Sequence, residues 1–144
     1  MKLNTKTRYG LRTMLEIALH SGERGILQKD IATSQNLSVK YLDQIISELK
    51  SANLIRTISG KKSGYKLTRE AKEICIYDIY LAFNPPLHLV NCLNEQECTL
   101  NNSCASQNFW CTLNAEIISK LQTKTLADIV IDHKKLTNQI MFYI

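Results

Sequence analysis

Four of the five cysteines lie within twenty consecutive residues, at Cys92, Cys98, Cys104 and Cys111. Thiolates are soft, charged ligands that suit iron–sulfur clusters, and free thiols can be oxidised reversibly. Structural zinc sites usually use ligand pairs two to four residues apart, and these cysteines are spaced more widely. The first residues carry no signal-peptide pattern, so metal or redox chemistry is expected here before disulfides.

Basic residues gather in the first half of the chain. Residues 1–72 contain 14 of the 18 lysines and arginines and only 6 acidic residues, whereas residues 73–144 contain 4 basic and 7 acidic residues. This asymmetry favours a polyanionic partner, such as nucleic acid, for the first half. No run of about 18 apolar residues is present, so the sequence predicts a cytoplasmic protein that does not span a membrane.

The spacing of apolar residues predicts a mainly α fold with a small β-wing. Helices are expected at about 7–21, 27–34, 38–51, within 68–83, at 108–123 and at 126–135, and short strands at 54–58 and 65–67. Ser38 is a good N-cap for the third helix, and a basic loop bounded by glycines joins the strands. This order of elements is typical of a winged helix-turn-helix.

The third helix is the predicted DNA-reading element, because a major groove about 12 Å wide admits a helix. The residues predicted to bind DNA are Ser38, Lys40, Tyr41 and Gln44 in this helix, Lys61 and Lys62 in the loop, and Arg8 in the first helix. A polar helix face is also often only a solvated surface, and Tyr41 has a second interpretation as part of the core.

Four segments resemble the Rrf2 family of transcriptional regulators, to which IscR, NsrR, RirA and CymR belong. They are Leu3-x-Thr5-Lys6-x-Arg8-Tyr9-Gly10-Leu11, Leu37-Ser38-x-x-Tyr41-Leu42-Asp43-Gln44-Ile45, Gly64-Tyr65-x-Leu67 and Thr125-Leu126-Ala127-Asp128-Ile129. The resemblance runs from residue 2 to about 130. It implies a winged-helix homodimer that represses or activates promoters and binds a palindromic operator in double-stranded DNA.

The resemblance also implies how the chain is divided. Residues 1–83 would form the winged helix-turn-helix domain, residues 84–107 a cysteine-containing loop, and residues 108–144 dimerisation helices. The apolar stripe Trp110, Leu113, Ile117 and Leu121 matches the long helix that pairs with its partner in the family; without the family it would be interpreted as core. The wing departs from the usual pattern, because Ser59 stands where many relatives carry an arginine, so the operator need not be the same.

The spacing Cys92-x5-Cys98-x5-Cys104 resembles that of the cluster-binding members, which implies a 2Fe–2S cluster as cofactor. Some of those relatives place a histidine three residues after the third cysteine, where this chain has Gln107. Others take a carboxylate or histidine from the first helix of the partner subunit, and the matching stretch of this chain offers Arg8 and Arg12, which cannot ligate iron. The fourth ligand is therefore the open question.

Cys111 is the candidate for that fourth ligand, and His88 is a weaker one. Three arrangements stay open: a cluster held by Cys92, Cys98, Cys104 and Cys111, a cluster held by three cysteines with a labile fourth ligand, and a thiol switch without iron. The cluster is the favoured prediction.

Two other function classes compete with the regulator. An iron–sulfur carrier, which shuttles electrons or clusters, would use the basic face to dock acidic proteins, and it would not discriminate between duplexes. An enzyme is not expected, because the sequence shows no Ser/His/Asp or Cys/His arrangement and His20, His88 and His133 are scattered. The sequence therefore predicts a DNA-binding regulator without enzymatic activity.

Overall fold

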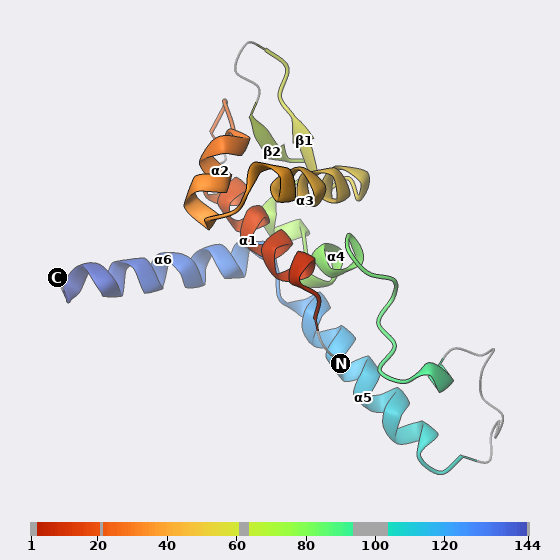
Figure 1. Ribbon diagram of the computed structural model, residues 1–144. Coiled ribbons are helices and arrows are strands. Elements are labelled where there is room, and N and C mark those ends of the chain that lie inside the picture. Colours follow the sequence, from red (N-terminus) through yellow and green to blue (C-terminus); the bar gives the residue numbers. More distant parts are fainter. Residues whose placement is uncertain (1–2, 21, 61–63, 94–103, 144) are drawn as a thin grey trace.

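The computed structural model describes residues 3–20, 22–60, 64–93 and 104–143. Its elements are α1 (Thr5–Leu19), α2 (Gln28–Gln35), α3 (Val39–Ser51), β1 (Ile55–Thr57), β2 (Tyr65–Leu67), the 3-10 turn η1 (Ala71–Glu73), α4 (Ile76–Leu81), the 3-10 turn η2 (Asn91–Leu93), α5 (Gln107–Thr123) and α6 (Leu126–Phe142). The fold is mostly helical with one two-stranded antiparallel sheet, as predicted. Figure 1 shows a body made by α1 to α4 and the hairpin, from which α5 and α6 leave in different directions.

Helix α1 is the centre of this body and contacts α2, α3, α4, β2 and α6. It begins after the N-cap Asn4, whose side chain accepts a hydrogen bond from the Thr7 amide at 2.7 Å. Gly10 allows α1 to approach the end of α4, because a Cβ at this position would lie 2.2 Å from the Phe83 ring. The fully buried apolar side chains on and around α1 are Met14, Ile17, Ile31, Leu42, Ile45, Leu49, Leu54, Ile74, Ile79 and Leu126.

The segment from α2 to α3 is a helix-turn-helix. Asn36 is the C-cap of helix α2 and adopts a left-handed conformation with φ of 52°. Its amide donates to the carbonyl groups of Ala32 and Thr33. Asparagine tolerates this conformation better than most residues. Ser38 then caps α3 by accepting a hydrogen bond from the Tyr41 amide at 3.2 Å. The predicted cap and the predicted third helix are both confirmed.

The hairpin rests on the segment that precedes α2. The Tyr65 amide donates to the Ile26 carbonyl at 2.8 Å, and the Ile26 amide donates back at 3.2 Å. Two glycines make this close approach possible. A Cβ on Gly64 would lie 2.4 Å from the Arg24 carbonyl oxygen, and a Cβ on Gly25, whose φ is 59°, would lie 2.4 Å from that of Tyr65.

The two strands pair Ile55 with Leu67, Arg56 with Lys66 and Thr57 with Tyr65. Residues directly opposite each other in an antiparallel pair project from the same face, so Arg56 and Lys66 place two positive charges side by side. Neither residue forms an ion pair with any acidic residue in the described part of the chain. Like charges in this position destabilise a hairpin.

The junction between α5 and α6 is bonded to the body. The Ile76 amide donates to the Lys124 carbonyl at 2.9 Å, and the Leu126 amide donates to the Ile74 carbonyl at 2.8 Å. Thr125 and Asp128 form a capping box that starts α6. Beyond this junction burial is low: no residue of α5 is fully buried, and within α6 only Leu126 is.

Two outcomes concern the last helices. The helix predicted at 108–123 is confirmed as α5, but α6 continues to Phe142, seven residues past the expected end at Lys135. No proline or glycine follows Lys135, so nothing local stops the helix. The division at residues 83 and 107 stays a prediction. Among the described residues, no helix is both long enough and apolar enough to cross a bilayer.

Candidate nucleic-acid interface and cysteine-bearing segment

The outer face of α3 is exposed at its N-terminal end. Leu42, Ile45, Ile46 and Leu49 point into the core. Of the residues predicted to bind DNA, Ser38, Lys40 and Gln44 are exposed, and Arg8 is exposed on α1. Val39, which the sequence interpretation passed over, is 53% exposed in the first turn of α3. An exposed apolar residue in the first turn of a recognition helix can contact a thymine methyl group.

Tyr41 has a different environment from its predicted companions, because it is half-buried against α1. Its ring meets that of Tyr9 edge to face, with 5.8 Å between the ring centroids. The Arg12 guanidinium lies over the Tyr9 ring, 5.0 Å from its centroid. Arg12 also donates hydrogen bonds to the Gln35 side-chain oxygen at 2.6 Å and to the Gln35 backbone carbonyl at 3.2 Å. These contacts join α1, α2 and α3, and they set the position of Tyr41.

A second polar link joins α3 to the wing. The Gln28 amide group, at the start of α2, donates to the Asp43 carboxylate on the outer face of α3. The Tyr65 hydroxyl, from β2, donates to the same Gln28 side chain at 3.5 Å. Partial burial raises the pKa of Tyr65, and the Asp43 charge raises it further. Sequence reasoning missed Gln28, because the three residues are far apart in the chain and no local pattern joins them.

The other predicted wing contacts, Lys61 and Lys62, lie outside the described residues. The stem that carries them is described, and it adds the exposed Arg56 and the half-buried Lys66 to the basic surface near α3. Lys6 is less available, since its ammonium pairs with Glu48 of α3 at 2.5 Å.

The described candidate cysteines lie in η2, in the turn before α5 and on α5 itself. Cys92 is half-buried in η2, Cys104 precedes α5, and Cys111 is exposed on α5, whereas Cys98 lies outside the described residues. The Cys104 sulfur lies 3.2 Å from the Ser106 hydroxyl oxygen. Hydrogen bonds from the Ser106 hydroxyl and from nearby backbone amides lower the pKa of the Cys104 thiol, whereas burial raises that of Cys75 at the start of α4.

These thiols are not gathered into a ligand set by the described part of the chain. No three His, Cys, Asp or Glu residues converge there in a way that can hold a metal ion. The donor chemistry still suits iron, since Cys104 and Cys111 are thiols at or near the surface and hydrogen bonds lower the pKa of Cys104.

The segment that leads to Cys92 is fastened to α5 by one side chain. The Asn114 carboxamide accepts a hydrogen bond from the Leu89 amide at 3.0 Å and donates one to the Leu87 carbonyl at 3.1 Å. The Leu87 amide also donates to the Tyr77 hydroxyl at 3.4 Å. Residues 87–93 are thus held against α5, and this contact determines where Cys92 lies relative to Cys111.

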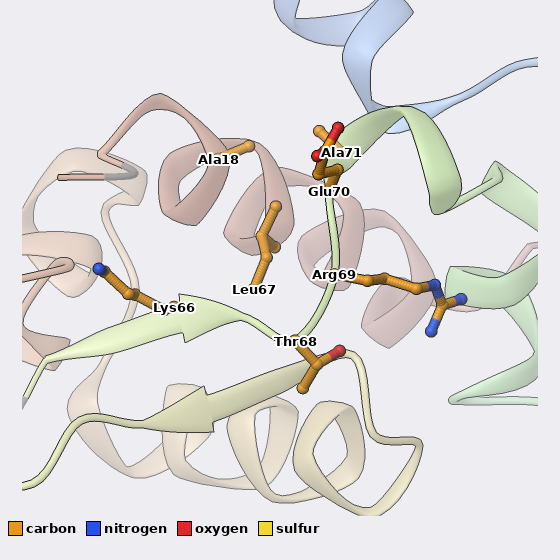
Figure 2. Close-up of a pocket in the computed structure, with 7 residues that line it drawn as sticks. All are labelled: Ala18, Lys66, Leu67, Thr68, Arg69, Glu70 and Ala71. Atoms are coloured by element: carbon orange, nitrogen blue, oxygen red, sulfur yellow. The ribbon is translucent and has the colours of Figure 1, made fainter. Parts of the chain in front are cut away.

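A hollow of about 460 Å³ lies between the end of α1, β2 and the segment leading to η1 (Figure 2). Ala18 and Leu67 line it with apolar surface, and Lys66 and Arg69 point away from each other. Arg69 is already bonded to Asp78 at 3.0 Å. Ligand pockets usually present convergent polar groups, so this hollow does not define a small-molecule site.

An exposed polar helix end, seated by a two-helix turn and flanked by a basic hairpin, defines the class of winged-helix DNA-binding proteins. Comparison with known proteins agrees. The profile of the Rrf2 family, described as iron-dependent transcriptional regulators, matches residues 3–132. The chain therefore belongs to the Rrf2 family and is a DNA-binding transcriptional regulator; its relatives are regulators and not enzymes.

Several relatives cover nearly the whole chain. Protein rrf2 of Nitratidesulfovibrio vulgaris is 37% identical over 92% of this chain and 89% of its own length. The HTH-type transcriptional regulator IscR of Vibrio atlanticus is 32% identical over 94% and 79%. Among solved structures, CymR (YrzC) of B. subtilis, titled a global cysteine regulator, has a TM-score of 0.78 at 33% identity, covering 90% of this chain and 96% of its own. IscR of T. potens has a TM-score of 0.75 at 30% identity, covering 94% and 90%.

Proposed function

We propose that this regulator binds a palindromic duplex as a homodimer and that α3 reads the bases. The observation that carries the proposal is the exposed N-terminal end of α3. These residues are all exposed: Gln44 would read a base edge, Lys40 and Ser38 would bind phosphates, and Val39 would contact a thymine methyl group. Tyr41 contributes by positioning, through Tyr9. Arg8, Lys61 and Lys62 add phosphate contacts.

The apolar face of α5 supports the homodimer. The stripe Trp110, Leu113, Ile117 and Leu121 on α5 is only half-buried and provides the apolar surface for helix pairing.

A duplex-binding titration of the Gln44→Ala variant tests the reading role of α3. One good bidentate base contact contributes about 1–3 kcal/mol, so affinity for the selected duplex should fall about 5–150-fold and discrimination at one base pair in each half-site should be lost. Ser51→Ala, at the far end of the same helix, is the control and should bind as the wild type does. An unchanged preference at every base pair in Gln44→Ala would contradict the assignment.

We further propose that the cysteine-bearing segment supplies the regulatory signal. The favoured form is a 2Fe–2S cluster held by Cys92, Cys98 and Cys104, with Cys111 or, less favourably, His88 as fourth ligand; bound there, it would supply iron–sulfur redox chemistry. The family's description as iron-dependent supports this form. The chain's own part is to order residues 87–111 between the wing and the dimer helix, which would set the spacing of the two recognition helices.

A thiol switch without iron is the second candidate. The lowered pKa of Cys104 favours it, and so does the likeness to CymR. An oxidised form of CymR from Staphylococcus aureus has been solved. It has a TM-score of 0.70 at 33% identity to this chain, covering 90% of this chain and 96% of its own. The visible spectrum after anaerobic reconstitution distinguishes the two candidates. A cluster predicts absorbance that Cys92→Ala, Cys98→Ala and Cys104→Ala each remove, whereas a thiol switch predicts no visible band in the wild type.

A further inference from the structure

An acidic residue lies on the outer face of α3. Asp43 is exposed beside Gln44, and Lys40 lies one turn earlier on the same face. A carboxylate on a surface that approaches phosphates is repelled by them. Among the residues that the structure describes, no lysine, arginine or histidine forms an ion pair with Asp43. The partner of this carboxylate is instead the neutral side chain of Gln28.

The amide group of Gln28 makes two contacts. Its nitrogen donates to the Asp43 carboxylate, and its oxygen accepts from the Tyr65 hydroxyl of β2 at 3.5 Å. Because a carboxylate accepts hydrogen bonds and does not donate them, the amide nitrogen has to face Asp43, which leaves the amide oxygen for the hydroxyl. Gln28 is half-buried, and a hydrogen bond to a charged group is stronger than one between neutral groups. The side chain thus has one preferred orientation between α3 and the wing.

The backbone that precedes Gln28 is bonded to the wing as well. Ile26 exchanges two backbone hydrogen bonds with Tyr65, at 2.8 and 3.2 Å. The other end of α3 is joined to the hairpin by the chain itself, where the Leu54 amide donates to the Leu49 carbonyl at 3.0 Å and β1 follows. In Figure 1 the base of the hairpin lies beside α2 and α3. Helix α3 is therefore attached to the wing at its C-terminal end by the chain and in its N-terminal half through Gln28.

We propose that Gln28 is a positioning residue for DNA reading, because it fixes the N-terminal half of α3 relative to the wing. Phosphate contacts set the register in which a protein lies on a duplex, so a fixed wing determines which base pairs α3 meets. Gln28 would thus contribute to sequence discrimination without touching a base, and Asp43 would act as its anchor. A helix that is fixed before binding also loses less conformational freedom on the duplex. The inference rests on the reading role proposed for α3 and adds a residue to it.

The variant Gln28→Met tests the inference, since it keeps the length of the side chain and removes both hydrogen bonds. Discrimination is measured as the affinity for the duplex that the wild type selects from a random library, divided by that for an unrelated duplex of equal length. A hydrogen bond to a charged group corresponds to about tenfold in an equilibrium constant, so discrimination should fall about fivefold to tenfold. Circular dichroism checks that the variant is folded. Thr33→Ala, which removes a hydroxyl bonded within α2 to the Lys29 carbonyl, is the control and should discriminate as the wild type does.

A reversed hydrogen bond separates positioning from a general effect on stability. Gln28→Glu places a second carboxylate against Asp43 and should reduce discrimination by about tenfold or more. Gln28→Glu combined with Asp43→Asn keeps the net charge of the wild type and lets the new amide donate to the new carboxylate. Discrimination should then return to within about threefold of the wild type, as expected for two residues that act through one contact. Recovery would not occur if the Asp43 carboxylate itself read a base, because the double variant lacks it.

Three results would overturn the inference: unchanged discrimination in Gln28→Met, a double variant that discriminates as poorly as Gln28→Glu, and an equal loss in Thr33→Ala. A wild type that prefers no duplex would instead overturn the reading role of α3 itself. The failure of the positioning role and the failure of the proposed function are therefore distinguishable.

Discussion

The body that carries α3 and the C-terminal arm, formed by α5 and α6, differ in how much of their apolar surface is buried. The body has a closed core, and polar links such as Gln28 to Asp43 hold its elements in place. The arm has two 17-residue helices, and Leu126 is their one fully buried residue in the described structure. The difference indicates that the body buries its core within one chain, whereas α5 and α6 leave apolar surface exposed, as the proposed homodimer requires. Under this proposal, DNA contact and pairing belong to separate parts of the molecule.

The largest expected effect comes from a charge in the α5 stripe. Ile117→Lys should leave the body folded but dissociate the homodimer, because a lysine ammonium cannot be desolvated in an apolar helix pair. Losing the link between two half-sites reduces operator affinity by about 100-fold to 10,000-fold. Gel filtration with light scattering and a duplex titration measure both effects. Ala115→Lys, exposed on the other side of α5, is the control, and tight operator binding by a monomeric Ile117→Lys would break the comparison.

The next effect concerns the folding stability of the body within a single chain. Gly64→Ala should lower the free energy of unfolding by about 2–3 kcal/mol, because its Cβ would press on the backbone of Arg24 and Ile26. This loss should be independent of protein concentration if the body folds within one chain. Thermal denaturation at two concentrations measures it. Gly22→Ala, where a Cβ meets nothing within 4 Å, should be nearly neutral.

A smaller effect is expected where the arm carries a polar link of its own. Asn114→Ala removes both hydrogen bonds to residues 87–89, and each such bond contributes about 0.5–1.5 kcal/mol. Detachment of residues 87–89 from α5 should cost about 1–2 kcal/mol less, so alkylation of Cys92 should accelerate while DNA affinity of the metal-free protein stays constant. Peptide mass spectrometry follows the labelling. Asn108→Ala at the start of α5 serves as control, and unchanged Cys92 labelling would remove Asn114 from this role.

The smallest effect is a difference in pH dependence between two thiols of the metal-free protein. The pKa of Cys104 is lowered and that of Cys75 is raised, so the thiolate of Cys104 forms at lower pH. Iodoacetamide should therefore modify Cys104 severalfold faster than Cys75 near pH 7, and the two rates should converge as the pH rises. A Cys75 rate equal to that of Cys104 at neutral pH would contradict the assignment.

The body could be predicted from the sequence because its signals are local. Ser38 as a cap, the buried spacing of Leu42, Ile45, Ile46 and Leu49, and the glycine-bounded wing are each visible within a few residues, and all are present in the structure. The hydrogen bonds that join Gln28 to Asp43 and Tyr65 depend on elements brought together by folding, so no local sequence pattern predicts them.

The cysteine-bearing segment was less predictable. The spacing of the cysteines suggested a shared ligand set, but Cys92, Cys104 and Cys111 lie in η2, in the turn before α5 and on α5, and the position of Cys92 depends on Asn114 across the chain. The full length of α6 was also missed. Its outer half has helix-compatible residues and no stop signal near Lys135, so the boundary expected there had no local support.

The facing pair Arg56 and Lys66 has a consequence for ionic strength. Dissolved ions weaken the repulsion between these side chains in the free hairpin, and they also weaken the attraction between a basic wing and phosphates. Added salt should thus stabilise the hairpin in the free protein and weaken its binding to DNA at the same time. Under the proposed DNA contact, the phosphates of the duplex would supply the negative charge that faces Arg56 and Lys66 in dilute buffer.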